Sequence, residues 1–504
     1  MLGCRPAHAT LATALLLWCA DAGAQCSTGR ATWHPSVPNI ATGDYALDLH
    51  QGPVFAGTRV IGLAGAFVAI AEGVDGDTQN PASPAVRAPY SYSSAEQEFG
   101  FGVTFPSGLR HYDFFNSGRE TCLPTGNQVY VFLNGAVHVQ IDNWGFAATG
   151  DLQQYSFRGQ NAAPEAGTRS LTAQIMQNHL MTAHAFDDGQ LAIGVGARVT
   201  TLTITTRSSV LEEGTNLLRT QGAGLELGFV FRPNDTRVRV GAAFRSTSTA
   251  ETPASSRRLL NGDNDDPEDD RFIPSRVTVP WDLNLGAALQ LGQRPLNPPW
   301  INPRDLVDRV RRRVDWRARE RARVARKRVT LARSRGEDTT ALSARLAEEE
   351  NDDATRDEEE IETAKEDVKR SIRRAYAVMP RPHVLITTSL VMTGVVEDGV
   401  GLEGFLDGKE QRSGQQVSVS PRVGLELEPI LHWTKLRGGA YFEPTRFATN
   451  TAGGRSHSTF GIEQKILPWE VFGTFPEGNW FRVTGAVDLA RNYLGWAVAI
   501  GVWH

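Results

Sequence analysis

The chain has 504 residues, of which 40% are hydrophobic and 22% charged, so it carries enough apolar sequence for a large core and is not a wholly disordered protein. Its 52 Lys and Arg nearly balance its 57 Asp and Glu, so no global basic field indicates a nucleic-acid partner. Glycine is unusually abundant, at 49 residues, where a helical bundle or solenoid would use Ala, Leu and Glu. The composition therefore favours a β-rich chain with many turns.

The first 24 residues have the features of a secretory signal peptide. Arg5 lies in a short basic region, an apolar run extends from Leu11 to Trp18, and residues 22–24 fit the small-residue cleavage pattern. Lipidation is not expected, because neither Cys19 nor Cys26 follows a small residue. We expect export with cleavage after Ala24.

After that cleavage two cysteines remain, Cys26 and Cys122, so an oxidising compartment allows one disulfide at most. No later segment has about 18 or more consecutive apolar residues, so no transmembrane helix is expected. The chain is then either exported and soluble, or inserted into an outer membrane as a β-barrel.

Apolar residues alternate with small or charged ones over most of the chain outside residues 293–381. Such period-two alternation predicts strands with one apolar and one polar face, which suits a soluble sandwich as well as a barrel. Charges in the middle of the other face favour a wet or plugged lumen, and therefore a barrel. These charges are Arg198, Glu226, Arg239, Arg422 and Glu426.

The alternation predicts fourteen strands, the even number that an outer-membrane barrel with both ends in the periplasm requires. In the last strand, Leu494, Trp496, Val498, Ile500 and Val502 are expected to face lipid, as in the C-terminal signal that barrel assembly machinery binds. The predicted strands are 90–105, 127–138, 143–155, 170–186, 190–206, 219–232, 236–247, 277–292, 382–397, 414–430, 434–446, 456–467, 479–490 and 493–503.

Residues 293–381 differ in kind from the strands. Residues 304–335 carry 14 Lys or Arg and 4 Asp or Glu, whereas residues 337–367 carry 3 and 14. Two helices that meet near Gly336 can therefore pair as a charged antiparallel hairpin, with a solvated linker as the alternative. Strand parity places this insertion after the eighth strand, on the periplasmic side.

The segment from Thr58 to Glu72 is glycine-rich, and no charge lies between Val60 and Ala71. It predicts a short helix with a small-residue face, which an Asn-Pro-Ala turn at residues 80–82 follows. From these residues alone, an apolar capping helix and a plug are equally good interpretations. The candidate residues of the segment are Gly62, Leu63, Gly65, Phe67, Ile70, Asn80, Pro81 and Ala82.

This segment resembles the N-terminal hatch of the FadL family, outer-membrane transporters of long-chain fatty acids and other hydrophobic compounds. The match consists of Gly-Ala-Phe-Val-Ala at 65–69 and Asn-Pro-Ala at 80–82, with weaker likeness at 421–428 and 436–445. The resemblance implies a fourteen-stranded barrel that the hatch plugs, and passive uptake of hydrophobic small molecules. The charged insertion is foreign to the family, so the resemblance leaves the substrate open.

We therefore predict an all-β, 14-stranded antiparallel transmembrane β-barrel in the bacterial outer membrane, with outer-membrane lipid and a hydrophobic ligand as partners. The expected parts are a signal peptide (1–24), a hatch or plug (25–89), barrel strands (90–292 and 382–504) and a charged helical insertion (293–381). The alternative is a structural or accessory barrel that docks a periplasmic envelope or secretion protein through residues 300–376.

No catalytic, cofactor or metal motif is expected. His179 and His184 are five residues apart in a predicted strand and hence on opposite faces, so they cannot form a metal pair. The acidic run 263–270 lacks the glycine of a calcium loop and has Pro267 at a ligand position. An outer-membrane lipase, which needs Ser and His together on the barrel wall, is the enzyme-class alternative.

Overall fold

The structure is a computed structural model of the whole chain. It describes residues 33, 36–88, 91, 93–107, 111–119, 121–122, 128–158, 170–207, 215–252, 258–259, 271–380, 383–450, 453–468 and 480–503. The predicted signal peptide, Cys26 and the acidic run 263–270 lie outside these residues.

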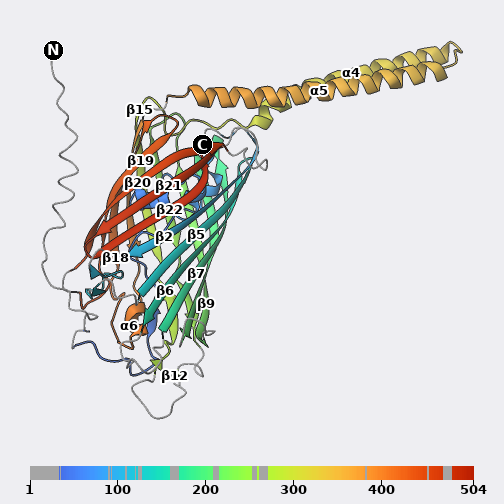
Figure 1. Cartoon of the computed structure of the whole chain (residues 1–504). Coiled ribbons are helices and arrows are strands. Elements are labelled where there is room, and N and C mark those ends of the chain that lie inside the picture. The colour runs from blue at the N-terminus through green and yellow to red at the C-terminus, as the bar shows by residue number, and fades with distance from the viewer. Residues whose placement is uncertain are drawn as a thin grey trace, which may run out of the picture.

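Fourteen antiparallel strands close into one barrel, as the alternation predicted (Figure 1). Each strand pairs with its neighbours in the chain, and the last strand pairs with the first, with Phe101 opposite Ile500. The strands are β2 (Ala95–Ser107), β5 (Gln128–Ile141), β6 (Trp144–Arg158), β7 (Ser170–Phe186), β8 (Leu191–Arg207), β9 (Thr215–Phe231), β10 (Val238–Arg245), β15 (Asp282–Gly292), β16 (His383–Thr393), β18 (Ser418–Ile430), β19 (Thr434–Glu443), β20 (Arg455–Pro468), β21 (Trp480–Ala490) and β22 (Tyr493–Trp503).

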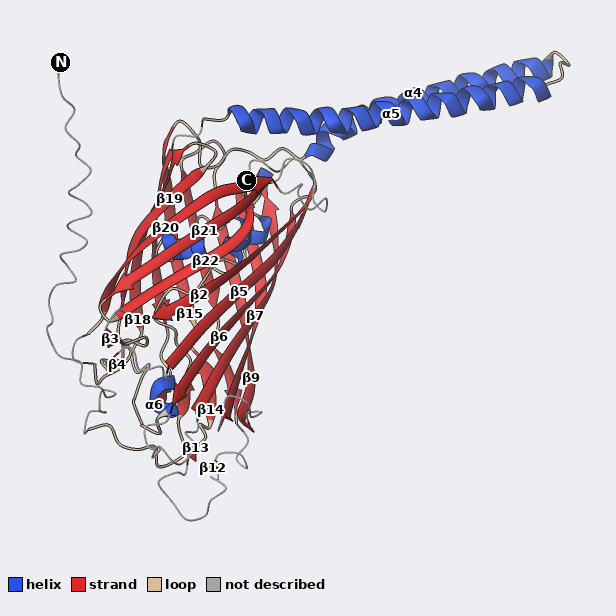
Figure 2. Cartoon of the chain, in the orientation of Figure 1, coloured by secondary structure: helices blue, strands red, loops and turns tan. Residues whose placement is uncertain are grey.

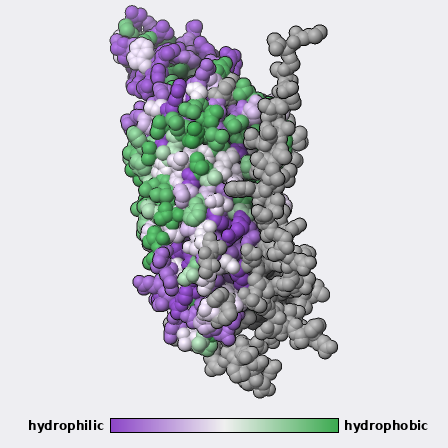
Figure 3. Space-filling model, turned by 90° about the vertical axis from the view of Figure 1, so that its left-hand side faces the viewer, coloured by the Kyte–Doolittle hydropathy of each residue, from purple (hydrophilic) through white to green (hydrophobic). Residues whose placement is uncertain are grey.

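Apolar side chains face outward along the strands and form a band around the barrel. In β22, Trp496, Val498 and Ile500 are exposed whereas Tyr493 and Ala497 are buried, as predicted. Figure 3 shows the apolar band between two hydrophilic ends. Because a water-exposed surface of this extent is unfavourable, the barrel is embedded in a membrane through this band.

Several predicted strands are too long at the end of the barrel where the long connections lie; the strand predicted at 414–430, for example, begins only at Ser418. Segment 277–292 divides at Pro280 into β14 (Arg276–Val279) and β15, because proline cannot donate a ladder hydrogen bond. Segment 382–397 leaves the barrel after Thr393. In the lumen β14 joins β1 (Ala46–Asp48), β17 (Gly399–Gly401) and β11 (Ser248–Glu251) in a separate four-stranded sheet.

The two ends of the barrel differ. Short turns join the strands at one end, which we call the arm end, because the charged insertion also leaves the barrel there (Figure 2). The opposite end, the loop end, carries β3 (His111–Tyr112), β4 (Thr121–Cys122), β12 (Arg258–Leu259), β13 (Arg271–Phe272) and α6 (Leu402–Leu406). Strand parity therefore places the insertion with the short turns, as predicted.

The insertion is a pair of long helices, α4 (Pro303–Ser334) and α5 (Thr340–Val378), which we call the arm. Salt bridges of Arg317 with Glu360 and of Arg321 with Asp357 join the helices in antiparallel order. Gly336 lies in the turn at the tip with a φ of +73°, a conformation that favours glycine. None of the described helices is long and apolar enough to cross a membrane.

We expect a substitution at a wall glycine facing the hatch to destabilise the protein. A Cβ at Gly241 would lie 2.6 Å from the Cα of Ala69, whereas a Cβ at Gly135 would have no neighbour closer than 3.9 Å. Gly241→Ala should lower stability by about 1–3 kcal/mol, and the control Gly135→Ala by less. Thermal unfolding in detergent checks this, and equal midpoints for the two variants would contradict it.

A protease site inserted at Gly336 tests the side of the membrane on which the arm lies. If the arm end faces the periplasm, whole cells should be resistant, and cleavage should occur once the outer membrane is opened. The same site at Gly408, in the turn that follows α6 at the loop end, is the matched control and should be cut in intact cells. The reverse pattern would show that the barrel has the opposite orientation.

Candidate functional site

The hatch segment, residues 56–88, lies inside the barrel at the level of the arm-end half. It contains α2 (Thr58–Gly62), α3 (Gly73–Asp77) and the single turn η1 (Ser83–Ala85), joined by irregular backbone. The predicted helix over 58–72 is wrong beyond Gly62. Ala64 has a φ of +56° and Gly65 a φ of +74°, which no right-handed helix accommodates.

The barrel wall explains why this segment is not helical. Thr387 Oγ1 donates to the carbonyl of Ala66 at 2.7 Å, and Arg239 Nη1 donates to the carbonyl of Ile70 at 2.8 Å. Thr459 Oγ1 likewise donates to the carbonyl of Gly62 at 3.2 Å. The wall thus supplies hydrogen bonds that a helix would otherwise supply within its own backbone.

Small residues on both surfaces allow the hatch to approach the wall closely. The Cα of Gly461 lies 3.2 Å from where a Cβ of Gly62 would be. A side chain at Gly65 would overlap the guanidinium of Arg422. The larger predicted residues Leu63, Phe67 and Ile70 are fully buried in one cluster with wall residues.

The Asn-Pro-Ala turn is hydrogen-bonded both to another part of the hatch and to the barrel wall. Asn80 Nδ2 donates to the carbonyl of Val68 at 2.8 Å and to that of Phe229 at 3.0 Å. Its Oδ1 accepts from the backbone N–H of Ala82 at 2.9 Å, as in an Asx turn. The structure therefore brings all eight predicted hatch residues together in the plug, including the buried Pro81.

Arg239 connects the hatch with the base of the arm. Besides the Ile70 carbonyl, its guanidinium contacts Glu72 Oε1 at 2.8 Å, Asn297 Oδ1 at 2.5 Å and the Leu296 carbonyl at 2.7 Å. Burial would raise the pKa of Glu72, but the guanidiniums of Arg239 and Arg59 lower it to about 2. Glu72 is therefore ionised throughout the neutral range and balances the buried cation.

Buried ion pairs also tie α2 to β18, β19 and β20, joined to those of Arg239 through the salt bridge of Arg59 with Glu72, and they were missed from the sequence. Glu426 accepts from Arg59 at 3.0 Å and from Arg437 at 2.6 Å, and Arg437 also bonds Glu463. Mid-strand charges at alternate positions were the available signal, and they identified Glu426 but not its partners. Arg198, Glu226 and Arg239, which were predicted to face a wet or plugged lumen, are buried inside the barrel.

On its β5 to β9 side, the half of the lumen toward the loop end is apolar and aromatic, whereas its β19 and β20 side carries buried charges such as Glu443 and Arg455. Inward side chains of β5 to β9 form the mouth cluster, which Phe114 and Leu47 of β1 cover. Phe114 packs edge-on against Phe132 and Tyr155, with ring centroids 5.6 and 5.7 Å away. The wall residues of the mouth cluster are Tyr130, Phe132, Tyr155, Leu171, Ile175, Leu202, Ile204 and Leu218.

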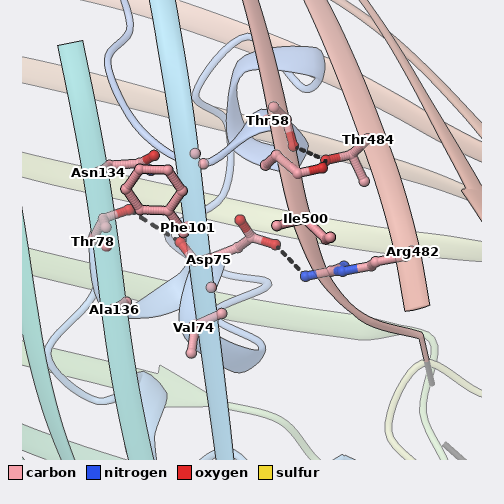
Figure 4. A pocket seen from close by; sticks show the side chains of 15 residues that line it. Thr58, Val74, Asp75, Thr78, Phe101, Asn134, Ala136, Arg482, Thr484 and Ile500 are labelled. Carbon is pink, nitrogen blue, oxygen red and sulfur yellow. Dashed lines mark hydrogen bonds and ion pairs between the residues drawn. The ribbon is translucent and has the colours of Figure 1, made fainter. Parts of the chain in front are cut away.

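A small pocket separates the hatch from strands β2, β5, β21 and β22 (Figure 4). Asp75 of the hatch and Arg482 of the wall meet at 3.3 Å beside it. Phe101 and Ile500, whose side chains are exposed on the outside of the barrel, also line it. It encloses about 30 Å³, room for one or two water molecules but not for a hydrophobic ligand.

Buried histidines of the wall pair with carboxylates. His179 Nδ1 lies 2.9 Å from Glu226, and His457 contacts Asp488 and Glu443, each at 2.7 Å. His184 lies on the opposite face of β7 from His179, beside Trp144, so the two do not form a metal pair. Among the described residues, no group of three or more His, Cys, Asp or Glu side chains could hold a metal ion.

No protein-family model and no curated protein matches the sequence. Solved structures do resemble it in fold. One is a FadL homologue of Pseudomonas aeruginosa, which is 9% identical in sequence; the match covers 90% of this chain and 99% of that chain, with a TM-score of 0.47. The toluene transporter TbuX of Ralstonia pickettii has 10% identity, 90% and 98% coverage, and a TM-score of 0.43. The toluene transporter TodX of Pseudomonas putida has 11% identity, 92% and 98% coverage, and a TM-score of 0.42.

In fold, as in its N-terminal motif, the chain resembles FadL-family channels. The sequence identities are near 10% and the TM-scores are below 0.5. The barrel assignment therefore rests on the strand pairing of this chain.

We expect Glu72→Gln to weaken the protein in a pH-dependent way. The folded-state pKa of Glu72 lies near 2, below the ordinary value of 4.5, so the carboxylate stabilises the fold above pH 4.5. The difference in stability between wild type and variant should be on the order of 3 kcal/mol at pH 7 and should shrink as the pH falls from about 4.5 to about 2.

Thermal unfolding of both proteins from pH 7 to pH 2 measures this difference. Glu397→Gln, at an exposed acidic residue of the loop end, controls for general effects of acid on the barrel. A difference that is constant across the range would rule out ionisation of Glu72 as its cause.

Proposed function

We propose that this protein is a bacterial outer-membrane channel for passive uptake of hydrophobic small molecules such as long-chain fatty acids. The observation that carries the proposal is the mouth cluster. Water-filled channels need polar walls, whereas here Phe132, Tyr155 and Leu202 point into the lumen. Such a surface binds apolar molecules by removing them from water.

The hatch supplies the second requirement of such a channel, a barrier to water and ions. Its backbone fills the lumen on the arm-end side of the mouth cluster. Wall side chains such as Arg239 and Thr387 bond its carbonyls. We propose that a ligand enters at the loop end, displaces loop side chains such as Phe114 from the mouth cluster, and passes when the hatch shifts. The predicted signal peptide and the C-terminal strand support an outer-membrane location.

Uptake of labelled oleate and labelled toluene by cells that lack their own channel tests the proposal. Cells that produce the protein should take up at least one ligand faster than the empty strain. Asn80→Ala should change the rate several-fold, because it removes the side-chain bonds to Val68 and Phe229. Deletion of residues 56–84 removes most of the hatch and should also change the rate of uptake.

Replacement of residues 303–378 by a short linker is the matched control. It removes the arm but leaves the lumen intact, so uptake should stay at the level of the intact protein. Equal uptake by the intact protein and the empty strain for both ligands would refute the channel. A loss of uptake with the arm would show that transport depends on an arm partner.

A further inference from the structure

The base of the arm is fixed at the edge of the apolar band. Asn302 Nδ2 donates to Asp142 Oδ1 at 3.1 Å, and Arg304 forms a salt bridge with Asp142 Oδ2 at 2.6 Å. Asp142 lies in the turn between Ile141 and Trp144, whose side chains are 43% and 49% exposed on the outside of the barrel. Because that band lies in the bilayer, the arm begins at the level of the lipid headgroups.

From this base the arm projects sideways beyond the barrel wall (Figures 1 and 2). α4 has 32 residues, which corresponds to about 48 Å of helix. A membrane that surrounds the barrel therefore continues beside the arm for much of its length.

In the middle of the hairpin, charged residues lie in the seam between the helices, where Arg321 contacts Asp353 at 3.1 Å. Buried Val314 and Ala332 of α4 lie on either side of this charged part. Other large apolar residues of α4 are exposed: Trp316 is 66% exposed and Leu331 is 53% exposed. A helix pair in water normally buries such residues, so this surface indicates a partner.

The exposed apolar residues of α4 form one stripe. At 100° per residue, positions 306, 309, 313, 316, 320, 324, 327, 331 and 334 fall within an arc of about 80°. The stripe holds four apolar residues (Leu306, Trp316, Val324, Leu331), three basic residues (Arg309, Arg313, Lys327), Glu320 and Ser334. Glu320 bonds Arg323, which offsets its charge.

We propose that this stripe of α4 lies on the anionic glycerophospholipid headgroups of the leaflet at the arm end. Tryptophan and aliphatic side chains enter the interface between headgroups and acyl chains, while arginine and lysine bind phosphate. The stripe combines these residue types at the height where the arm leaves the barrel. The proposal concerns membrane contact and does not depend on what the barrel transports.

Spin labels on the full-length protein in lipid nanodiscs test this contact. One label replaces Leu331 in the stripe, and a control label replaces Ala318, an exposed residue of α4 outside the stripe. Cys26 and Cys122 are changed to serine, and protein without an added cysteine controls for background labelling. Power saturation with oxygen and with a water-soluble nickel complex measures the depth of each label.

In nanodiscs with 30 mol% phosphatidylglycerol, we expect the Leu331 label to be shielded from nickel and accessible to oxygen, and the Ala318 label to remain accessible to nickel. Arg309→Ala/Arg313→Ala/Lys327→Ala should reduce this shielding, as should nanodiscs of phosphatidylcholine alone. Equal nickel access at both labels in anionic nanodiscs would overturn the proposal. Shielding accompanied by dipolar broadening between labels, or appearing only after an envelope protein is added, would assign the stripe to a protein partner and also overturn it.

Discussion

The buried guanidinium of Arg239 is the interaction on which the arrangement of this protein most depends. It bonds the Ile70 carbonyl and Glu72 of the hatch together with Leu296 and Asn297 at the base of the arm. A buried arginine is costly unless its donors are satisfied, and here two separate parts of the chain, the hatch and the base of the arm, satisfy them. The strand, the plug and the insertion therefore hold their positions relative to one another through one side chain.

The lumen has two halves with different physical roles. Near the arm end, the wall presents charges and hydroxyls that bond an irregular plug backbone, as Thr387 does for Ala66. Near the loop end, its β5 to β9 side presents the aromatic and aliphatic residues of the mouth cluster, and its β19 and β20 side presents buried ion pairs such as Arg455 with Glu443. Polar groups are needed to bond the irregular backbone of the hatch, so the apolar surface is confined to the part of the wall that does not bond it.

Period-two alternation predicted the barrel because every strand has lipid on one side and the lumen on the other, so β7 and β22 match their predicted bounds. The hatch conformation was not predictable in the same way. Its carbonyl partners Thr459 and Arg239 lie 397 and 169 residues away along the chain, and the spacing of its small and apolar residues alone favours a helix. The mouth cluster was missed because alternation shows which residues face inward but not that inward Tyr155 and Leu202 converge at one end.

The fit between hatch and wall is uneven, and this sets the direction in which the plug yields most easily. Toward β10, Ala69 presses on Gly241 and the Arg239 guanidinium binds both Ile70 and Glu72, so movement there breaks several buried bonds at once. Toward β2 and β21, the small pocket lies between the surfaces, and the polar contacts beside it are the salt bridge of Asp75 with Arg482 and the hydrogen bond between the Thr58 and Thr484 hydroxyls. A displacement of the hatch on that side would break these two contacts, whereas removal of the whole plug would also break the bonds of Arg239 to Ile70 and Glu72.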